Sequence, residues 1–372
     1  MKIALIGPTY PFRGGISHYT TLLYRTIRRN HQVTLYSFKK QYPKFLFPGK
    51  TDRDVSKSPI IEEGACRIIS PMNPLTWFLT LNRIARYRPR VVVISWWVSF
   101  WGPSFFAIAA FCRAILRIRV LFICHNVIEH ETFFVKRWLA KLALSAGHGF
   151  IVHSKEDLNN LKALVPKAKV RLVYHPLYSA FNTGGFSADE AKRRLNLSGH
   201  VLLFFGFIRK YKGLEYLLGA MSAILKEIDA TLLVAGEFWQ DKTRYLDLIK
   251  RSGIERNVVI KDGYVPNEDV CLYFTAADLV VLPYTHGTGS GILQLAYAFK
   301  RPVVATSVGC LPEVVKDGVT GYIVPPCETA PLADAVIKFF AEGKASEFSG
   351  HIAENSGEFS WDNIAKTIEE LA

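Results

Sequence analysis

The stretch that decides the fold is LPYTHGTGSGILQLAYAFKRPVVATSVGCLPEVV, from Leu282 to Val315. It follows an apolar run that predicts a strand, passes through a glycine-rich turn, and enters a helical pattern that ends near Lys300. Pro302 then breaks the helix before a β-branched run at 303–306. The stretch therefore predicts a βαβ unit whose loop leaves unpaired backbone N–H groups at a helix start. Because the helix dipole places partial positive charge there, this loop can hold phosphate.

A simpler interpretation is that Ser290 only caps the helix. A basic segment upstream favours the phosphate interpretation. Residues 204–206 end another predicted strand, and Arg209 and Lys212 follow at its carboxyl end. Open α/β sheets bind ligands at that edge, so two cations there suit a diphosphate. We expect the backbone amides of the loop to bind phosphate, and expect Gly289→Val to disrupt the loop because valine tolerates unusual φ angles poorly.

Five motifs resemble those of the retaining family-4 glycosyltransferases. They are FGFIRKYKG at 205–213, SGIL at 290–293, RPVVATSVGCLPE at 301–313, GGISHY at 14–19 and HNVIEHE at 125–131. The resemblance covers nearly the whole chain and implies an α/β fold of two doubly wound, Rossmann-like domains facing across a cleft, the GT-B architecture. It implies an acceptor-side domain at 1–180, joined by a crossover helix at 358–372, and a nucleotide-sugar-binding domain at 181–357.

The resemblance also implies roles for individual residues. Arg209 and Lys212 would neutralise the leaving diphosphate, and His125 would lie beside the donor sugar, so these three are the expected catalytic residues. The residues expected to bind the donor are Gly14, Gly15, Gly206, Gly289, Ser290, Gly291, Ile292 and Glu313. Without the resemblance, His125 could equally be a capping or core residue, and the glycine pair before His18 a helix-start turn. His130 and Glu131 would orient the loop and cap the next helix.

Two carboxylates of the resembled family are missing. Most members carry two glutamates separated by seven residues, and the matching positions here hold Gly287 and Leu295. Gln294 is one position away from the second, which is about 100° around a helix. The family mechanism assigns no carboxylate nucleophile, and the leaving diphosphate is thought to assist attack on the same face. The loss of the two glutamates therefore affects the expected identity of the donor sugar and its nucleotide more than the expected class of reaction.

Composition indicates a globular protein with free thiols. The chain has 372 residues, 49% hydrophobic and 21% charged, and its six cysteines have no metal-ligand spacing. Strand residues begin at Ile3 with no signal peptide before them, so we expect a cytoplasmic protein.

The sequence Asp52-Arg53-Asp54 spells a metal-binding DxD signature, but it lies in a charged run and not after an apolar strand. We expect no metal and no cofactor besides the donor.

Positive charge is concentrated in the N-terminal half. Residues 1–180 contain 27 Lys+Arg and 8 Asp+Glu, a balance of +19, whereas 181–372 contain 19 and 24, a balance of −5. No zinc finger or RNP-type motif accompanies the charge, so an anionic membrane surface is favoured over nucleic acid as the partner. We expect docking through Arg83, Arg86, Arg88 and Arg90 and through the segment 103–119, whose apolar residues are Phe105, Phe106, Ile108, Phe111, Ile115 and Leu116. Those apolar residues could instead pack against the sheet.

The uncharged run 91–112 is long enough to span a membrane. Its Gly102-Pro103 pair fits a junction between a buried strand and a helix better than the middle of a spanning helix. We therefore favour a strand followed by a surface helix.

Together these observations predict a retaining, metal-independent glycosyltransferase that uses a UDP- or GDP-sugar and a saccharide or lipid-linked acceptor. The expected setting is envelope polysaccharide or glycolipid assembly, at the inner face of the membrane as a peripheral protein. One alternative is a non-catalytic relative that acts as a binding partner. Another is a nucleotide-sugar epimerase, which should show its own acid/base carboxylates.

Overall fold

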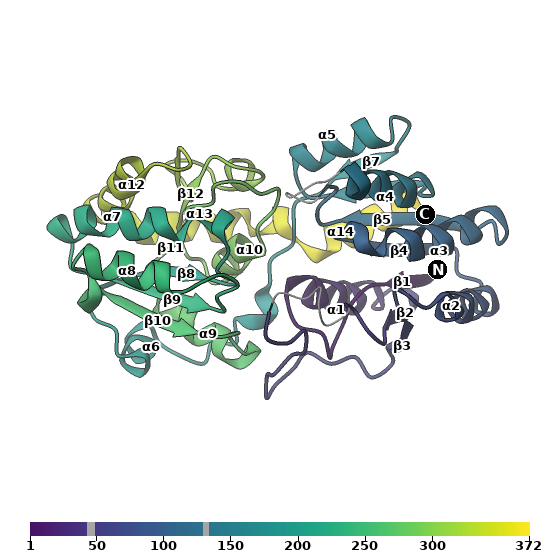
Figure 1. Cartoon of the computed structure of the whole chain (residues 1–372), viewed down its shortest axis with the longest axis horizontal. Coiled ribbons are helices and arrows are strands. Elements are labelled where there is room, and N and C mark those ends of the chain that lie inside the picture. Colours follow the sequence, from purple (N-terminus) through teal and green to yellow (C-terminus); the bar gives the residue numbers. More distant parts are fainter. Residues whose placement is uncertain (43–48, 129–133) are drawn as a thin grey trace. The chain divides into compact units, whose positions relative to one another are not determined.

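The computed structural model describes residues 1–42, 49–128 and 134–372, and the chain divides into two compact units. The first comprises Met1–Val55, Pro59–His175 and Ser360–Ala372, and the second Ser56–Ser58 and Pro176–Phe359. Each unit is built on one parallel sheet with helices around it (Figure 1). The prediction of two doubly wound α/β domains is confirmed.

The sheet of the first unit has the strand order β3-β2-β1-β4-β5-β6-β7. Its strands are β1 (Lys2–Ile6), β2 (Gln32–Phe38), β3 (Cys66–Ile69), β4 (Val91–Trp96), β5 (Arg119–Cys124), β6 (Gly149–Val152) and β7 (Val170–Leu172). The β4 and β5 strands pair in unbroken register from Val91 opposite Arg119 to Trp96 opposite Cys124. Every residue of β4 is buried, as expected for a central strand covered on both faces.

Helices cover both faces of this sheet. One face carries α2 (Pro74–Tyr87), α3 (Gly102–Ala114), α4 (Phe134–Ser145) and α5 (Lys155–Leu164). The other face carries α1 (Gly15–Ile27) and α14 (Trp361–Leu371). The C-terminal helix therefore completes the core of the first unit, although most of the second unit's chain separates it from the rest.

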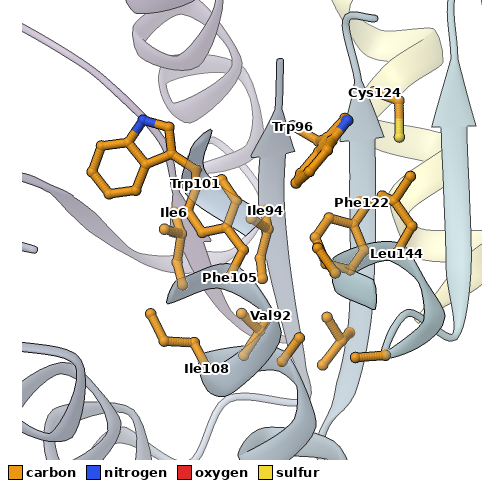
Figure 2. Packing of buried hydrophobic residues seen from close by; sticks show 14 of the residues in the cluster. Ile6, Val92, Ile94, Trp96, Trp101, Phe105, Ile108, Phe122, Cys124 and Leu144 are labelled. Atoms are coloured by element: carbon orange, nitrogen blue, oxygen red, sulfur yellow. The ribbon is translucent and has the colours of Figure 1, made fainter. Parts of the chain in front are cut away.

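The structure confirms that 91–112 is strand followed by helix, but corrects the surface that this helix presents. A 3₁₀ turn, η2 (Ser99–Trp101), joins β4 to α3. Trp101, Phe105 and Ile108 are fully buried, and Figure 2 shows them among the strand residues Ile6, Val92 and Ile94. The expectation that Phe105 and Ile108 face a bilayer is wrong, because both side chains fill the core between α3 and the sheet. Within the described residues no helix combines the length and apolarity needed to cross a membrane.

The second unit has the strand order β10-β9-β8-β11-β12-β13. Its strands are β8 (His200–Phe205), β9 (Ala230–Gly236), β10 (Val258–Asp262), β11 (Leu279–Leu282), β12 (Val303–Thr306) and β13 (Gly321–Val324). Its helices are α6 (Ala188–Leu195), α7 (Leu214–Glu227), α8 (Thr243–Arg251), α9 (Asn267–Ala276), α10 (Gly291–Ala298), α11 (Leu311–Val314), α12 (Thr329–Ala341) and α13 (Ala345–Glu354). The strand order reverses between β8 and β11, so the loops after these two strands flank the switch point at which such sheets bind ligands.

Candidate active site

The loops after β8 and β11 in the second unit are held tightly against each other. Gly213 has φ +69°, and a Cβ atom there would lie 1.8 Å from the carbonyl oxygen of Pro283. The N–H of Thr285 donates to the carbonyl oxygen of Tyr211 at 2.8 Å. Glycine is therefore required at 213 both for its backbone conformation and for the contact between the two loops.

A chain of side-chain hydrogen bonds crosses this switch point. Lys212 is 8% exposed, and its Nζ donates to the hydroxyl of Tyr284 at 2.5 Å. That hydroxyl lies 3.0 Å from Oγ of Ser290, which in turn accepts from the N–H of Leu293 at 3.3 Å. Ser290 is thus the N-cap of α10, as the simpler interpretation of the sequence has it. The chain connects a buried cation to the start of a helix.

Burial, and secondarily the guanidinium of Arg209, lower the pKa of Lys212 to about 7. The Arg209 guanidinium carbon lies 5.0 Å from the ring centre of Tyr211 and 5.4 Å from that of Trp239, which orients it beside the loop. Two cationic side chains thus stand close together, and the hydrogen-bond partner of Lys212 is a hydroxyl instead of a carboxylate. An anion bound here would relieve the repulsion and favour protonated Lys212.

The start of α10 approaches the end of β8 closely. Gly206 has φ +99°, and a Cβ atom there would lie 3.2 Å from Cδ1 of Ile292. The N–H of Gly206 donates to the carbonyl oxygen of Ala235 in the neighbouring strand at 2.9 Å. Gly206, Ser290, Gly291 and Ile292 therefore gather at the same corner of the sheet as Lys212.

The glycines of the loop before α10 have roles different from those expected. Gly289 is exposed, has no left-handed φ, and a Cβ atom there would have no neighbour within 4 Å. The expectation that Gly289 needs an unusual φ is wrong. The strained glycine is Gly287, at φ +144°, and a Cβ on Gly309 would lie 1.9 Å from its carbonyl oxygen. An L residue rarely adopts this conformation, so a glutamate at 287 would require a different loop.

Neither Leu295 nor Gln294 replaces the second of the two missing glutamates. Leu295 is buried, and Gln294 is 1% exposed with neither amide atom hydrogen-bonded within the part of the chain that the structure describes. A buried amide without partners is costly, and a water molecule or ligand would stabilise it. Glu313 lies partly exposed on α11, where its N–H donates to the carbonyl oxygen of Cys310.

His125 belongs to a cluster of rings in the first unit. It follows β5, and its N–H donates to the carbonyl oxygen of Trp96 at 2.8 Å. Its ring stands edge-on to Tyr19 with centroids 4.4 Å apart, and lies 5.6 Å from His153 and 6.3 Å from His175. These rings come from the carboxyl ends of the strands and from α1, so the sheet edge itself assembles the cluster.

His125 and His153 are neutral at physiological pH. Burial, then His153 and His175, hold the pKa of His125 well below its usual range, and burial lowers the pKa of His153 to about 4. Nδ1 of His153 donates to the carbonyl oxygen of Val173 at 2.7 Å, which leaves its Nε2 as an acceptor. No group within the described residues bonds Nε2 of His125. A neutral imidazole can exchange hydrogen bonds with a sugar hydroxyl, which suits the expected position of His125 beside the donor sugar.

The remaining predicted residues of the first unit lie at the start of α1. Gly14 is the N-cap at φ +102° with open space around it, and Gly15 is exposed. His130 and Glu131 lie outside the described residues. Asp52 of the DxD sequence pairs with Arg53 at 3.6 Å, and the described residues contain no cluster of three or more potential metal ligands.

Three of the eleven predicted site residues thus belong to the first unit and eight to the second. Sequence reasoning missed Tyr284, which links Lys212 to Ser290, and His153, which stands beside His125. Tyr284 lies inside the glycine-rich stretch, but an apolar context makes a buried tyrosine look like a core residue.

Family models match both halves of the chain. The model described as Glycosyltransferase Family 4 matches residues 13–178, and the one described as Glycosyl transferases group 1 matches 199–342. An uncharacterised glycosyltransferase of Methanocaldococcus jannaschii is 31% identical over 54% of this chain and 53% of its own. A D-inositol 3-phosphate glycosyltransferase of Corynebacterium diphtheriae is 29% identical over 59% of this chain and 52% of its own. The chain spans about half the length of the curated relatives it matches.

Solved structures share the fold. Anabaena HepE in complex with UDP superposes with a TM-score of 0.76 at 18% identity, over 100% of this chain and 99% of that one. The same protein in complex with UDP-glucose gives a TM-score of 0.74. The chain therefore has the same fold as HepE.

Proposed function

Because the chain belongs to the group 1 and family 4 glycosyltransferases of GT-B fold, we propose that it moves a sugar from a nucleotide-sugar donor to a saccharide or lipid-linked acceptor. The observation that carries the proposal is the buried Lys212, bonded through Tyr284 to the N-cap of α10 at the switch point. It combines a cation, a second cation at Arg209 and a helix start, which are the elements of a diphosphate site.

The proposed reaction retains the configuration at the anomeric carbon. The bond from that carbon to the diphosphate oxygen breaks, and a bond to the acceptor oxygen forms on the same face. The acceptor proton passes to the leaving diphosphate. Lys212 and Arg209 offset the negative charge that grows on the diphosphate, and this type of stabilisation is commonly the largest contribution to rate. Neutral His125 holds a donor hydroxyl by a hydrogen bond.

The proposal needs no metal or further cofactor. Lys212 and Arg209 supply the positive charge that a divalent ion supplies in enzymes with a metal-bound diphosphate. UDP-sugars lead the list of donors because HepE, which shares the fold, is known in complex with UDP and UDP-glucose. GDP-sugars remain in the test, since the chain lacks the two glutamates of the resembled family.

The proposed setting is envelope polysaccharide or glycolipid assembly at the cytoplasmic face of a membrane. The +19 balance of residues 1–180 supports it, because basic residues near an anionic surface contribute about 1 kcal/mol each. The non-catalytic and epimerase alternatives give distinct outcomes in the same experiment.

The experiment has two stages. Thermal unfolding is first measured with UDP-, GDP- and ADP-sugars, since a ligand at a hundred times its Kd stabilises by about 2.7 kcal/mol. The donor found is then incubated with saccharide and lipid-linked acceptors in the presence of EDTA, and the anomeric configuration of the product is read by NMR. Donor binding without turnover would favour the non-catalytic alternative, and epimerised donor the epimerase. If no nucleotide sugar stabilises the protein, the proposal fails.

A further inference from the structure

Exposed apolar side chains gather on two helices of the first unit. Seven large side chains there are between 54% and 86% exposed: Met72, Leu75, Phe78 and Leu79 at the start of α2, and Phe134, Val135 and Trp138 at the start of α4. None of them was singled out by the sequence pattern, which pointed to α3. The described part of the chain has only four other exposed large hydrophobic residues, and these are scattered.

The two groups lie at the same end of one helical layer. The helices α2, α3 and α4 each connect parallel strands of one sheet, so all three run back against the strands and start at its carboxyl edge. α3 contacts both α2 and α4 and therefore lies between them (Figure 1). In its first part Phe106, Ala107 and Ala110 are partly exposed and uncharged. The apolar surface thus extends across the starts of all three helices.

The charged residues of α2, α3 and α4 all have the same sign. The three helices carry six basic residues and no acidic residue, the basic ones being Arg83, Arg86, Arg113, Lys136, Arg137 and Lys141. By contrast α14, on the opposite face of the sheet, carries Asp362, Glu369 and Glu370 against Lys366. The helices α2 and α4, which expose apolar side chains, are therefore also positively charged.

A basic cavity adjoins the start of α2. Its volume is about 760 Å³, and its lining includes Lys39, Lys40 and Lys50 as well as Asn73 and Thr76 of the α2 start. Asn73 is the N-cap of α2 and lies between the exposed Met72 and Leu75. Cationic side chains thus stand directly beside the exposed apolar ones, which is the pairing needed to meet lipid phosphates and acyl chains at once.

We propose that the starts of α2, α3 and α4 form a docking surface for an anionic lipid bilayer. Aromatic and aliphatic side chains flanked by lysine and arginine are typical of segments that lie in the membrane interface. Phe78, Phe134 and Trp138 enter the headgroup region, while Arg137, Lys141 and the cavity lysines meet lipid phosphates. This deepens the proposed function, on which it rests only for the identity of the acceptor as lipid-linked.

The test is flotation of the full chain with vesicles of phosphatidylcholine alone and of phosphatidylcholine with phosphatidylglycerol. The triple variant Phe78→Ser, Phe134→Ser, Trp138→Ser should lower partitioning onto anionic vesicles at least tenfold. Leu246→Ser is the matched control, because Leu246 is 45% exposed on α8 of the second unit. Arg137→Gln with Lys141→Gln should weaken binding about thirtyfold at low salt, and Lys250→Gln with Arg251→Gln should not. High salt should reduce the charge-dependent part.

The proposal is overturned if the triple variant binds anionic vesicles as strongly as wild type, or if wild type does not bind anionic vesicles at low salt. In the second case, retention on a soluble polyanion would assign the charge to an acidic soluble partner. Thermal stabilisation by the donor, measured without vesicles, separates this proposal from the proposed function. The triple variant should keep that stabilisation in full, which also shows that it folds. Vesicle binding without donor binding would support the lipid-docking surface and contradict the proposed glycosyltransferase function.

Discussion

At the scale of single residues, Lys212 determines how the diphosphate side of the site works. Its Nζ is buried against Tyr284 and stands near Arg209, so a bound diphosphate would compensate both cations. Charge-assisted hydrogen bonds are worth about 1.5 to 3 kcal/mol, and more as charge develops in the transition state. We therefore expect Lys212→Ala and Arg209→Ala each to lower kcat by roughly two to three orders of magnitude. Lys210→Ala, an exposed change in the same 3₁₀ turn, is the control for steady-state kinetics.

The lowered pKa of Lys212 makes a second prediction. With a pKa of about 7 the free side chain is mostly neutral at pH 8, and a bound diphosphate raises that pKa again. Binding of the nucleoside diphosphate should therefore take up close to one proton at pH 8 and much less at pH 6. Calorimetry in buffers of different ionisation enthalpy measures this uptake. Lys212→Arg should keep binding but abolish the uptake, and an unchanged uptake would assign the proton to another group.

The same residues show where sequence reasoning about the site ends. The alternative interpretation of Ser290 as an N-cap could be made from the sequence, because its position before an apolar helical pattern fixes its local role. Tyr284 was missed because its role depends on contact with Lys212, which is 72 positions away in the chain. His153 was missed for the same reason, since only the parallel order of β5 and β6 brings it to His125. Motifs identify local geometry, whereas contacts across the sheet require the fold.

At the scale of elements, the two switch-point loops depend on particular glycines. Gly213→Ala would combine a left-handed φ with a Cβ 1.8 Å from the carbonyl oxygen of Pro283, so one loop must move away from the other. We expect it to destabilise the protein by about 2 kcal/mol or more and to abolish donor binding. Gly289→Ala meets open space and should leave stability nearly unchanged. Urea unfolding and donor titration of both variants check the contrast, and equal effects would contradict the close approach of the loops.

The elements themselves were predictable where the pattern was continuous. The strands β4 and β8 match the expected segments, because each is a continuous apolar run. The helix α14 lies within 358–372, where the resemblance implied a crossover helix. The short strands β3 and β13 were not identified. Four residues at the edge of a sheet contain too little alternation to be distinguished from a loop. The exposed apolar face of α2 was not identified either, because the burial of its residues depends on which neighbouring elements cover the helix.

At the scale of the whole molecule, buried histidines make the stability of the first unit sensitive to acid. His18 and His153 both belong to the first unit, and burial lowers the pKa of each to about 4 from a usual value of 6.5. Between these two values the unfolded chain binds a proton that the folded unit does not. The free energy of unfolding must therefore fall as the pH drops from 6.5 towards 4.

The size of the effect makes the last prediction. At pH 5 the lowered pKa of each of these histidines should decrease the free energy of unfolding by about 2 kcal/mol relative to pH 7, since one pKa unit corresponds to 1.36 kcal/mol. Hydrogen exchange at pH 5, corrected for the intrinsic rate, should therefore show the first unit opening more readily than the second. His153→Gln removes one titrating group and should lower the pH dependence of urea unfolding. If both units lost protection equally at pH 5, the neutral histidines would not be the acid-sensitive groups, and the assignment of His125 as a neutral hydrogen-bonding partner of the donor sugar would lose its electrostatic basis.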